Sequence, residues 1–103
     1  MKIEIPKNTL KAYFRARREF LDARDTRDEV KTRWERALDA NLGKVEISVS
    51  LDGAHKLNAP EDFQAVNREL TAAALAAENA HNKLEHARFK LLAEIKKYEK
   101  DFV

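Results

Sequence analysis

The residues that most readily interrupt a helix divide this chain into two long stretches. They are two prolines and two glycines, at Pro6, Gly43, Gly53 and Pro60. Neither residues 7–42 nor residues 61–103 contain another glycine or proline. In a helix interior, glycine is about 1 kcal/mol and proline about 3 kcal/mol less favourable than alanine, so long stretches that lack both are typical of helices. We therefore predict a first helix over residues 8–42 and a second over residues 59–102.

The second stretch carries an unbroken pattern of apolar residues that lie alternately three and four positions apart. This pattern consists of Phe63, Val66, Leu70, Ala73, Ala77, Ala80, Leu84, Ala87 and Leu91. Such spacing fills the a and d positions of a heptad and predicts a seam along which another helix packs. After Leu91 the apolar residues shift to Ile95, Tyr98 and Phe102, a four-residue stutter that locally unwinds a supercoil.

The first stretch has a weaker apolar pattern. Its members are Leu10, Tyr13, Phe14, Phe20, Leu21, Val30, Trp34, Ala37 and Leu38. Arg17, Arg24 and Arg27 occupy gaps on nearly the same face, so the predicted stripe is interrupted in its middle. The sequence TRDE at residues 26–29 also matches a capping box, which leaves open a break in the first helix at Asp25–Thr26.

Local signals predict where the helices begin and end. Asn8 or Thr9 is the expected N-cap of the first helix, and Gly43 supplies the left-handed residue after its last turn. For the second helix, Asn58 is the expected N-cap. A proline follows in its first turn, and Glu61 adds a carboxylate that the helix dipole favours.

Residues 44–57, between the helices, predict a strand or a hairpin. The apolar residues of this segment alternate with serine or charged residues: Val45, Ile47, Val49 and Leu51. Alternation of this kind is typical of a half-buried strand. Asp52–Gly53 is a turn signal, and residues 54–57 suit a short return strand. Residues 1–6 also alternate and predict a short head strand at the N-terminus.

Together these elements predict a mainly α protein that forms a single domain over residues 1–103. The expected fold is a long antiparallel helical hairpin, similar to a coiled coil, with a small β element at the connection and a short N-terminal strand. Charges favour a register in which the numbers of facing residues add to about 102. That register predicts ion pairs at Arg17–Glu85, Arg24–Glu78, Arg33–Glu69 and Glu19–Lys83.

Basic residues gather at the open end of this predicted hairpin. Residues 7–18 and 83–97 together carry a net charge of +8, whereas residues 19–82 carry −5. A basic end of this kind can bind nucleic-acid phosphates or an acidic protein partner. The candidate residues are Lys11, Arg15, Arg18, Arg88, Lys90 and Lys97. The alternative is a solvated face with internal ion pairs, in which the neighbouring aromatic residues belong to the seam.

The sequence contains no convincing catalytic or metal-binding constellation. Glu78 and His81 have the Glu-x-x-His spacing of di-iron bundles, but they fall on the flank of the seam. Four nearby residues supply the residue types of a catalytic triad: Ser48, Ser50, Asp52 and His55. No oxyanion donor accompanies them, so we interpret this grouping as accidental. We expect no enzymatic activity, no metal, no cofactor and no small-molecule substrate.

Cysteine is absent, which excludes disulfides and thiolate chemistry. No apolar run approaches the roughly 18 residues that a membrane span needs. The N-terminal sequence MKIEIPKNTL lacks the apolar core of a secretory signal. We therefore expect a cytoplasmic protein that does not enter a membrane.

The segment GKVEISVSLDGAH, followed by an alanine-rich helix, resembles the small dimeric YbaB-like nucleoid proteins, which are likewise helix–sheet–helix. The resemblance covers about a fifth of the chain. The sheet here is shorter by most of two strands, and the head strand has no counterpart in that family. The resemblance implies DNA binding as a second functional possibility.

The sequence as a whole favours a non-enzymatic protein-interaction module, an adaptor, regulator or inhibitor of the kind found among bacterial or phage accessory proteins. Its expected contact surfaces are the edge of the strand at residues 45–51 and the basic end of the helices. The alternative function is that of a dimeric helical protein that binds nucleic acid.

The predicted strands raise the question of how they pair. A continuous first helix of about 33 residues is about 50 Å long, so the head strand and the strand at residues 45–51 would lie at opposite ends. Because a lone strand is unstable, the alternatives are a local hairpin at Asp52–Gly53, a kink at Asp25–Thr26 or an antiparallel dimer.

We predict a homodimer, because Leu75, Phe89 and Leu92 lie off the main seam and offer apolar surface on a second helix face. Light scattering at high micromolar protein concentration is expected to give the mass of a dimer. A monomer mass under those conditions would contradict the prediction.

Overall fold

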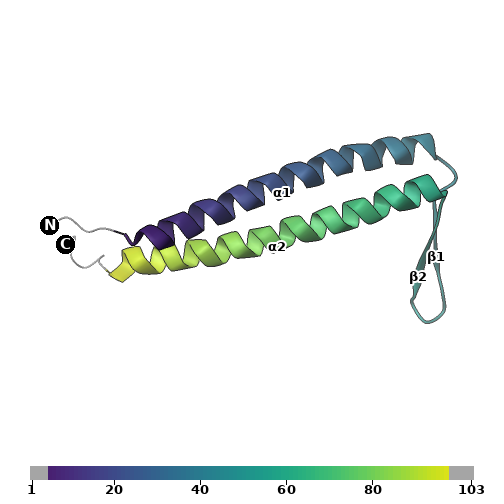
Figure 1. Cartoon of the computed structure of the whole chain (residues 1–103). Helices are drawn as coiled ribbons and strands as arrows, with labels where there is room; N and C mark the ends of the chain where they lie inside the picture. Colours follow the sequence, from purple (N-terminus) through teal and green to yellow (C-terminus); the bar gives the residue numbers. More distant parts are fainter. Residues whose placement is uncertain (1–4, 98–103) are drawn as a thin grey trace. The chain divides into compact units, whose positions relative to one another are not determined.

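The computed structural model describes residues 5–97 and shows two long helices packed against each other, with a small antiparallel sheet between them in the chain (Figure 1). Helix α1 comprises Lys7–Ala40, helix α2 comprises Glu61–Lys97, and the strands are β1, Glu46–Val49, and β2, His55–Asn58. This is the predicted helical hairpin with a small β element at its connection. Most of the predicted head strand, together with Tyr98 and Phe102, lies outside the described residues.

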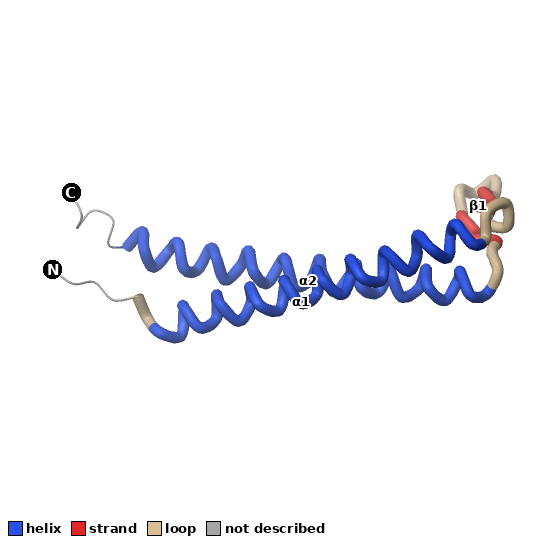
Figure 2. The backbone as a smooth tube through the Cα atoms, turned by 90° about the horizontal axis from the view of Figure 1, so that it is seen from above, coloured by secondary structure: helices blue, strands red, loops and turns tan. Residues whose placement is uncertain are grey.

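The chain consists of two compact units. The terminal unit comprises Met1–Arg24 and Ala76–Val103, and the hairpin unit comprises Asp25–Leu75. Each unit contains part of α1 and part of α2, and the hairpin unit also contains both strands, drawn in red in Figure 2.

Helix α1 begins one residue before its predicted start. The carbonyl oxygen of Pro6 accepts hydrogen bonds from the N–H groups of Thr9 (3.1 Å) and Leu10 (3.3 Å). Because helical bonding already starts at Pro6, Asn8 and Thr9 lie inside the first turn and do not act as N-caps. The rigid φ of proline suits this position, at which no N–H needs a partner.

Asn41 closes the other end of α1. Its side chain is buried, and its amide donates hydrogen bonds to the carbonyl of Ala37 (2.8 Å) and to Asp62 Oδ2 (3.3 Å) at the start of α2. Gly43 follows with a φ of 82°, the left-handed conformation that the sequence predicts. The helix ends at Ala40, two residues before its predicted end.

Helix α2 begins later than predicted, because Asn58 belongs to β2. The Asn58 side-chain amide donates a hydrogen bond to the Ser48 hydroxyl of β1, so it does not cap the helix. The carbonyl of Pro60 instead accepts the first helical hydrogen bond, from the N–H of Gln64 (3.0 Å). The Gln64 side chain donates back to the carbonyl of Ala59 at 2.7 Å, which ties the first turn to the preceding chain.

The predicted seam of α2 is confirmed from Phe63 to Leu91, where every member is buried or half-buried. Of the residues predicted to continue the pattern beyond Leu91, only Ile95 is described, and its assignment to the seam is wrong. Glu94 is half-buried, whereas Ile95 is 42% exposed. The heptad spacing continues beyond Leu91 without a stutter. Glu94, three residues after Leu91, therefore lies on the seam face, whereas Ile95, four residues after it, lies outside the seam.

Alanine residues occupy the contact face of α1 where the predicted apolar stripe is interrupted. In the terminal unit, Ala16 forms a buried cluster with Leu84 and Ala87. The half-buried rings of Tyr13 and Phe20 pack against this cluster. The short alanine side chains therefore form the centre of the helix contact, and the aromatic rings cover it.

The stripe continues through Ala23 and Arg27, which are both half-buried, whereas Arg17 is exposed. Phe14 is 58% exposed, so its assignment to the seam is wrong. Its position follows Tyr13 directly, and a helix turns by about 100° between neighbours, which rotates Phe14 away from α2. Helix α1 is uninterrupted at Asp25–Thr26, and the break that TRDE leaves open does not occur.

In the hairpin unit, aromatic residues hold the two helices together. Phe63 is 2% exposed, and its ring centroid lies 5.6 Å from that of Trp34. The indole N–H of Trp34 donates a hydrogen bond to Asn67 Oδ1 at 3.1 Å. Val30 is also buried. The Trp34 side chain is thus held by both a tilted ring contact and a hydrogen bond.

The predicted ion pair between Arg33 and Glu69 is present, at 2.8 Å. The predicted pair between Arg17 and Glu85 is not formed, because Glu85 accepts a 2.7 Å hydrogen bond from Arg88 one turn further along its own helix. A partner at i+3 on the same helix requires no alignment between helices.

Among the described residues, neither helix has an apolar stretch of sufficient length to cross a membrane.

The burial of the seam side chains predicts which substitutions lower the free energy of unfolding. We expect Leu84→Ala, at a side chain that is 5% exposed, to lower the free energy of unfolding by about 2–4 kcal/mol. The matched control is Leu42→Ala, where the side chain is 74% exposed and a change within about 0.5 kcal/mol is expected. Urea unfolding followed by circular dichroism measures both. Equal effects of the two substitutions would contradict this assignment of the core.

Candidate functional site

The β-hairpin presents one apolar face. Strands β1 and β2 pair antiparallel, with Ile47 opposite Leu57 and Val49 opposite His55. Directly opposed residues in an antiparallel pair point to the same side of the sheet. Ile47, Val49, Leu57 and His55 therefore share a face, and Glu46, on the opposite face, lies across from a polar residue.

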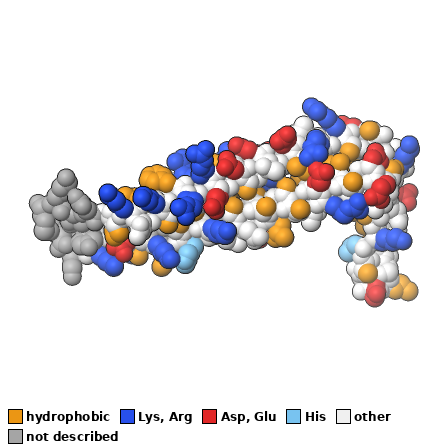
Figure 3. All heavy atoms as spheres, viewed as in Figure 1, with side chains coloured by type: hydrophobic (Ala, Val, Ile, Leu, Met, Phe, Trp, Pro, Cys, Tyr) orange, Lys and Arg blue, Asp and Glu red, His pale blue; other side chains and the backbone are white. Residues whose placement is uncertain are grey.

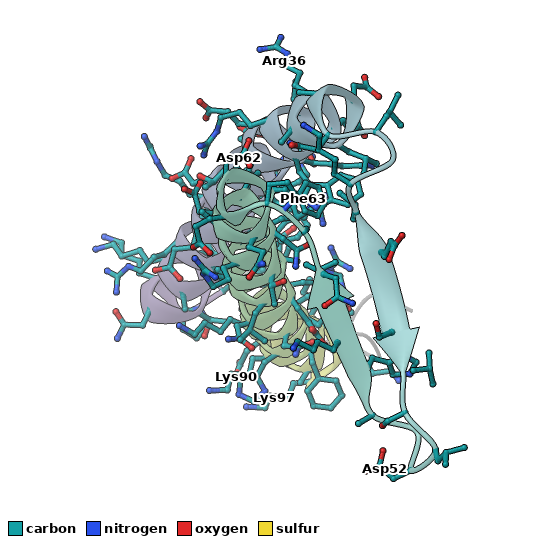
Figure 4. All side chains as sticks on the ribbon, turned by 90° about the vertical axis from the view of Figure 1, so that its right-hand side faces the viewer. Arg36, Asp52, Asp62, Phe63, Lys90 and Lys97 are labelled. Carbon is teal, nitrogen blue, oxygen red and sulfur yellow. The ribbon has the colours of Figure 1, made fainter. Side chains whose placement is uncertain are left out.

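This apolar face is open, which corrects the prediction of a half-buried strand. Ile47 is 67% and Val49 62% exposed, whereas Val45 and Leu57, nearer the base of the hairpin, are half-buried. Leu51 is fully exposed and lies in the turn, beyond the end of β1. The alternation correctly predicts the strand. The hairpin unit, however, places no element of its own over most of the apolar face (Figure 4).

An apolar groove of about 470 Å³ lies between the hairpin and the helices of the same unit. The helices contribute Trp34, Leu38, Phe63 and Asn67, and the hairpin contributes Val45, Ile47, His55 and Leu57. The helix side of the groove is rigid, because Trp34 is held by Asn67 and by the ring of Phe63. Figure 4 shows Phe63 near the base of the strands and Asp52 at the far tip.

The backbone of the hairpin is also available for pairing. Within the described residues the sheet contains β1 and β2 alone, so each strand has one edge without a neighbouring strand. An open edge presents N–H and C=O groups in the spacing that an added strand requires. The predicted contact residues Val45, Ile47 and Val49 are therefore on or beside an open edge, whereas Leu51 is in the turn.

The turn of the hairpin is held by its own polar groups. The Ser50 hydroxyl donates a hydrogen bond to Asp52 Oδ1, and the N–H of Ala54 donates to the same oxygen at 3.1 Å. Gly53 has a φ of 86°, as the Asp52–Gly53 turn signal predicts. These donors, first the Ser50 hydroxyl and then the Ala54 N–H, hold the pKa of the Asp52 carboxyl below its ordinary value.

The predicted basic residues all lie in the terminal unit, and all are exposed. Lys11, Arg15 and Arg18 share one face of α1, since they are spaced at i, i+4 and i+7. Two of the predicted residues on α2 are partly neutralised, because Arg88 pairs with Glu85 and Lys97 pairs with Glu94.

The structure brings Arg15 of α1 and Lys90 of α2 to one groove of about 240 Å³ in the terminal unit. Lys83 and His86 line the same groove, and sequence reasoning did not include them as site residues. The sequence does contain a feature that indicates Lys83. It lies seven residues before Lys90 and fourteen before Lys97, a heptad spacing that places all three on one side of α2. Figure 4 shows Lys90 and Lys97 projecting from that side.

The residues considered for catalysis and metal binding take part in other contacts in the structure. His81 lies with its ring centroid 5.4 Å from that of Phe20, in the terminal unit. In the hairpin, Ser50 and Asp52 bond to each other within the turn, and the Ser48 hydroxyl accepts from Asn58. Within residues 5–97, no three histidine or acidic side chains come together in a group that could hold a metal ion.

No protein-family model, curated protein or solved structure matches the chain significantly. The resemblance of the hairpin segment to the YbaB-like proteins therefore gains no support from these comparisons.

The turn gives a prediction for pH dependence. Because the pKa of Asp52 is lower in the folded hairpin, ionised Asp52 stabilises the turn above its ordinary pKa. This stabilisation is lost as the pH falls through the folded pKa. We expect Ser50→Ala to raise the pKa of Asp52 toward that of an unstructured peptide, in a carbon-13 NMR titration of the carboxyl group. Ser48→Ala, on a residue that does not contact Asp52, is the control. An unchanged pKa in Ser50→Ala would contradict the role of the hydroxyl.

Proposed function

We propose that this protein is a non-enzymatic interaction module of the cytoplasm, an adaptor, regulator or inhibitor that binds an extended segment of a partner protein along the β-hairpin. The observation that carries this proposal is the exposed apolar face of the hairpin. It lies beside a groove that is lined by Trp34, whose side chain is held by a hydrogen bond. Ile47 and Val49 are exposed side by side on one face, and adjoining exposed apolar side chains often mark a surface that binds a partner.

The occupant that fits best is an added strand. The open edge offers backbone hydrogen bonds, and the apolar face offers contacts for alternate side chains of the incoming segment. Such a segment would place every second side chain against Ile47 and Val49 and leave the others in solvent. The expected partner is therefore an extended peptide in which apolar and polar residues alternate.

The helix side of the groove supplies the fixed part of this surface. Trp34 bonds to Asn67 and packs on Phe63, which is almost fully buried, so the indole loses little conformational freedom when a partner binds. Rigid aromatic side chains of this kind commonly dominate the free energy of binding at an interface.

The terminal unit supports the proposal of a homodimer. Phe89 and Leu92 are 70% and 54% exposed, and together with Ala93 and Ile95 they line a hollow of about 450 Å³ on α2. Phe89 and Leu92 are the residues that the sequence predicts to lie off the seam in this unit, and Ile95 adds to the same apolar surface. A second copy of the chain provides an equivalent apolar surface, which is the requirement for a symmetric contact.

Binding at the hairpin can be tested with a designed peptide. The probe is a ten-residue peptide that alternates valine and threonine, and the readout is the fluorescence of Trp34, the sole tryptophan. We expect Ile47→Glu to weaken binding at least tenfold, because it places a carboxylate on the apolar face. Ser48→Glu is the matched control. It adds the same charge on the opposite face, across from Lys56, and should leave binding unchanged.

Two further measurements separate strand addition from other modes of binding. A peptide with N-methyl groups at alternate backbone positions cannot pair with the edge, and it should bind at least tenfold more weakly. Equal binding of the methylated peptide, or equal effects of the two glutamate variants, would contradict the proposal. In a pull-down from the native host, the expected partner is retained by Ser48→Glu but lost with Ile47→Glu.

A further inference from the structure

The groove in the terminal unit combines positive charge from both helices. Arg15 comes from α1, and Lys83, His86 and Lys90 come from α2. One acidic residue, Glu19, also lines the groove, and it forms no ion pair with the adjacent Lys83. The groove therefore gathers three basic side chains and an imidazole around one carboxylate.

The positive charge around this groove is not neutralised by the rest of its unit. Residues 5–24 and 76–97 contain eleven basic and five acidic side chains, a net charge of +6. Figure 3 shows lysine and arginine side chains gathered over this part of the two helices. Lys11, Arg15, Arg18, Lys83 and Lys90 form no ion pair with any described residue.

The floor of the groove consists of small side chains. Ala12, Ala16 and Ala87 line it, and the last two belong to the seam cluster. A volume of about 240 Å³ corresponds to about eight water molecules at about 30 Å³ each. One or two phosphate groups fit this space, whereas a nucleic-acid duplex is too wide to enter it.

An exposed aromatic ring lies next to these cations in the sequence. Phe14 is 58% exposed and lies on the face of α1 that carries Lys11 and Arg18, at spacings of three and four residues. The ring of Tyr13 contacts it edge to face, with centroids 5.5 Å apart, which restricts its motion. Arg15, the residue after Phe14, lines the groove, so the exposed ring and the groove are adjacent on α1.

We propose that this surface of the terminal unit binds single-stranded nucleic acid, with backbone phosphates in the groove of Arg15, Lys83 and Lys90 and a base stacked on Phe14. Unspecific binding of single strands typically combines a basic groove that follows the backbone with aromatic rings that stack on bases. An acidic polypeptide would use the cations alone, and a duplex has no unstacked base for Phe14.

The interaction can be measured by the fluorescence anisotropy of a labelled twenty-nucleotide oligothymidylate. For the three cations Arg15, Lys83 and Lys90 on a single strand, the logarithm of the binding constant should fall with the logarithm of the salt concentration with a slope of about −2. We expect Arg15→Glu/Lys90→Glu to weaken binding at least thirtyfold. Phe14→Ala should weaken binding at least fivefold without changing the salt slope, because the ring carries no charge.

The matched control is Lys31→Glu/Lys44→Glu, which makes the same change in net charge in the hairpin unit. It should retain binding within about threefold, because neither lysine lines the groove. Circular dichroism confirms that each variant is folded, and Arg15→Gln/Lys90→Gln repeats the test without introducing acidic groups. The proposal is overturned by equal losses in the two glutamate variants, by an unchanged affinity of Phe14→Ala, or by tighter binding of a duplex, polyglutamate or anionic vesicles.

Discussion

The rest of the structure depends on the close packing of α1 against α2, which is centred in the terminal unit on the contact of Ala16 with Leu84 and Ala87. Two helices alone have no interior other than the line along which they touch, so side chains of the seam must supply the apolar burial. Alanine in the centre of that line leaves room for only one layer of packing. Polar and charged residues therefore remain on the outer faces, and any binding surface of the protein must lie outside the seam.

Each unit uses this constraint differently. In the terminal unit, Ala16 and Ala87 belong to the seam and also line the basic groove. Their small side chains allow the helices to pack closely and leave space for a ligand in the groove. In the hairpin unit, Phe63 and Trp34 provide larger packing groups, and Trp34 also forms a wall of the apolar groove. Asn41 and Asp62 join the end of α1 to the start of α2, from which the strands extend. The helix contact thus contributes residues to both proposed surfaces.

The sequence predicts most of the fold because its strongest signals are local. The spacing from Phe63 to Leu91, the turn at Asp52–Gly53 and the left-handed Gly43 each depend on neighbouring residues, and the structure agrees with all three. The seam of α1 is harder to see, because Ala16 and Ala23 contribute to packing through their small size and do not stand out as apolar. Ile95 was assigned by its hydrophobicity, yet helix geometry gives the seam position to Glu94.

The candidate surfaces depend on contacts that the sequence does not contain. Alternation predicts that one side of β1 is apolar, but it does not determine whether this chain or a partner covers it. Lys83 and His86 join Arg15 only once the two helices are placed in register. The register itself is predicted through Arg33–Glu69, while Glu85 takes the partner nearest along its own helix, Arg88.

The central claim is that one chain packs α1 against α2 in this register within each unit. An isotope-filtered NOE experiment on a mixture of labelled and unlabelled chains tests it most directly. We expect NOEs within one chain from the Ala16 methyl group to Leu84 and Ala87, and from the Trp34 indole to Phe63. NOEs from these groups to residues one heptad away, or NOEs found only between labelled and unlabelled chains, would contradict the account.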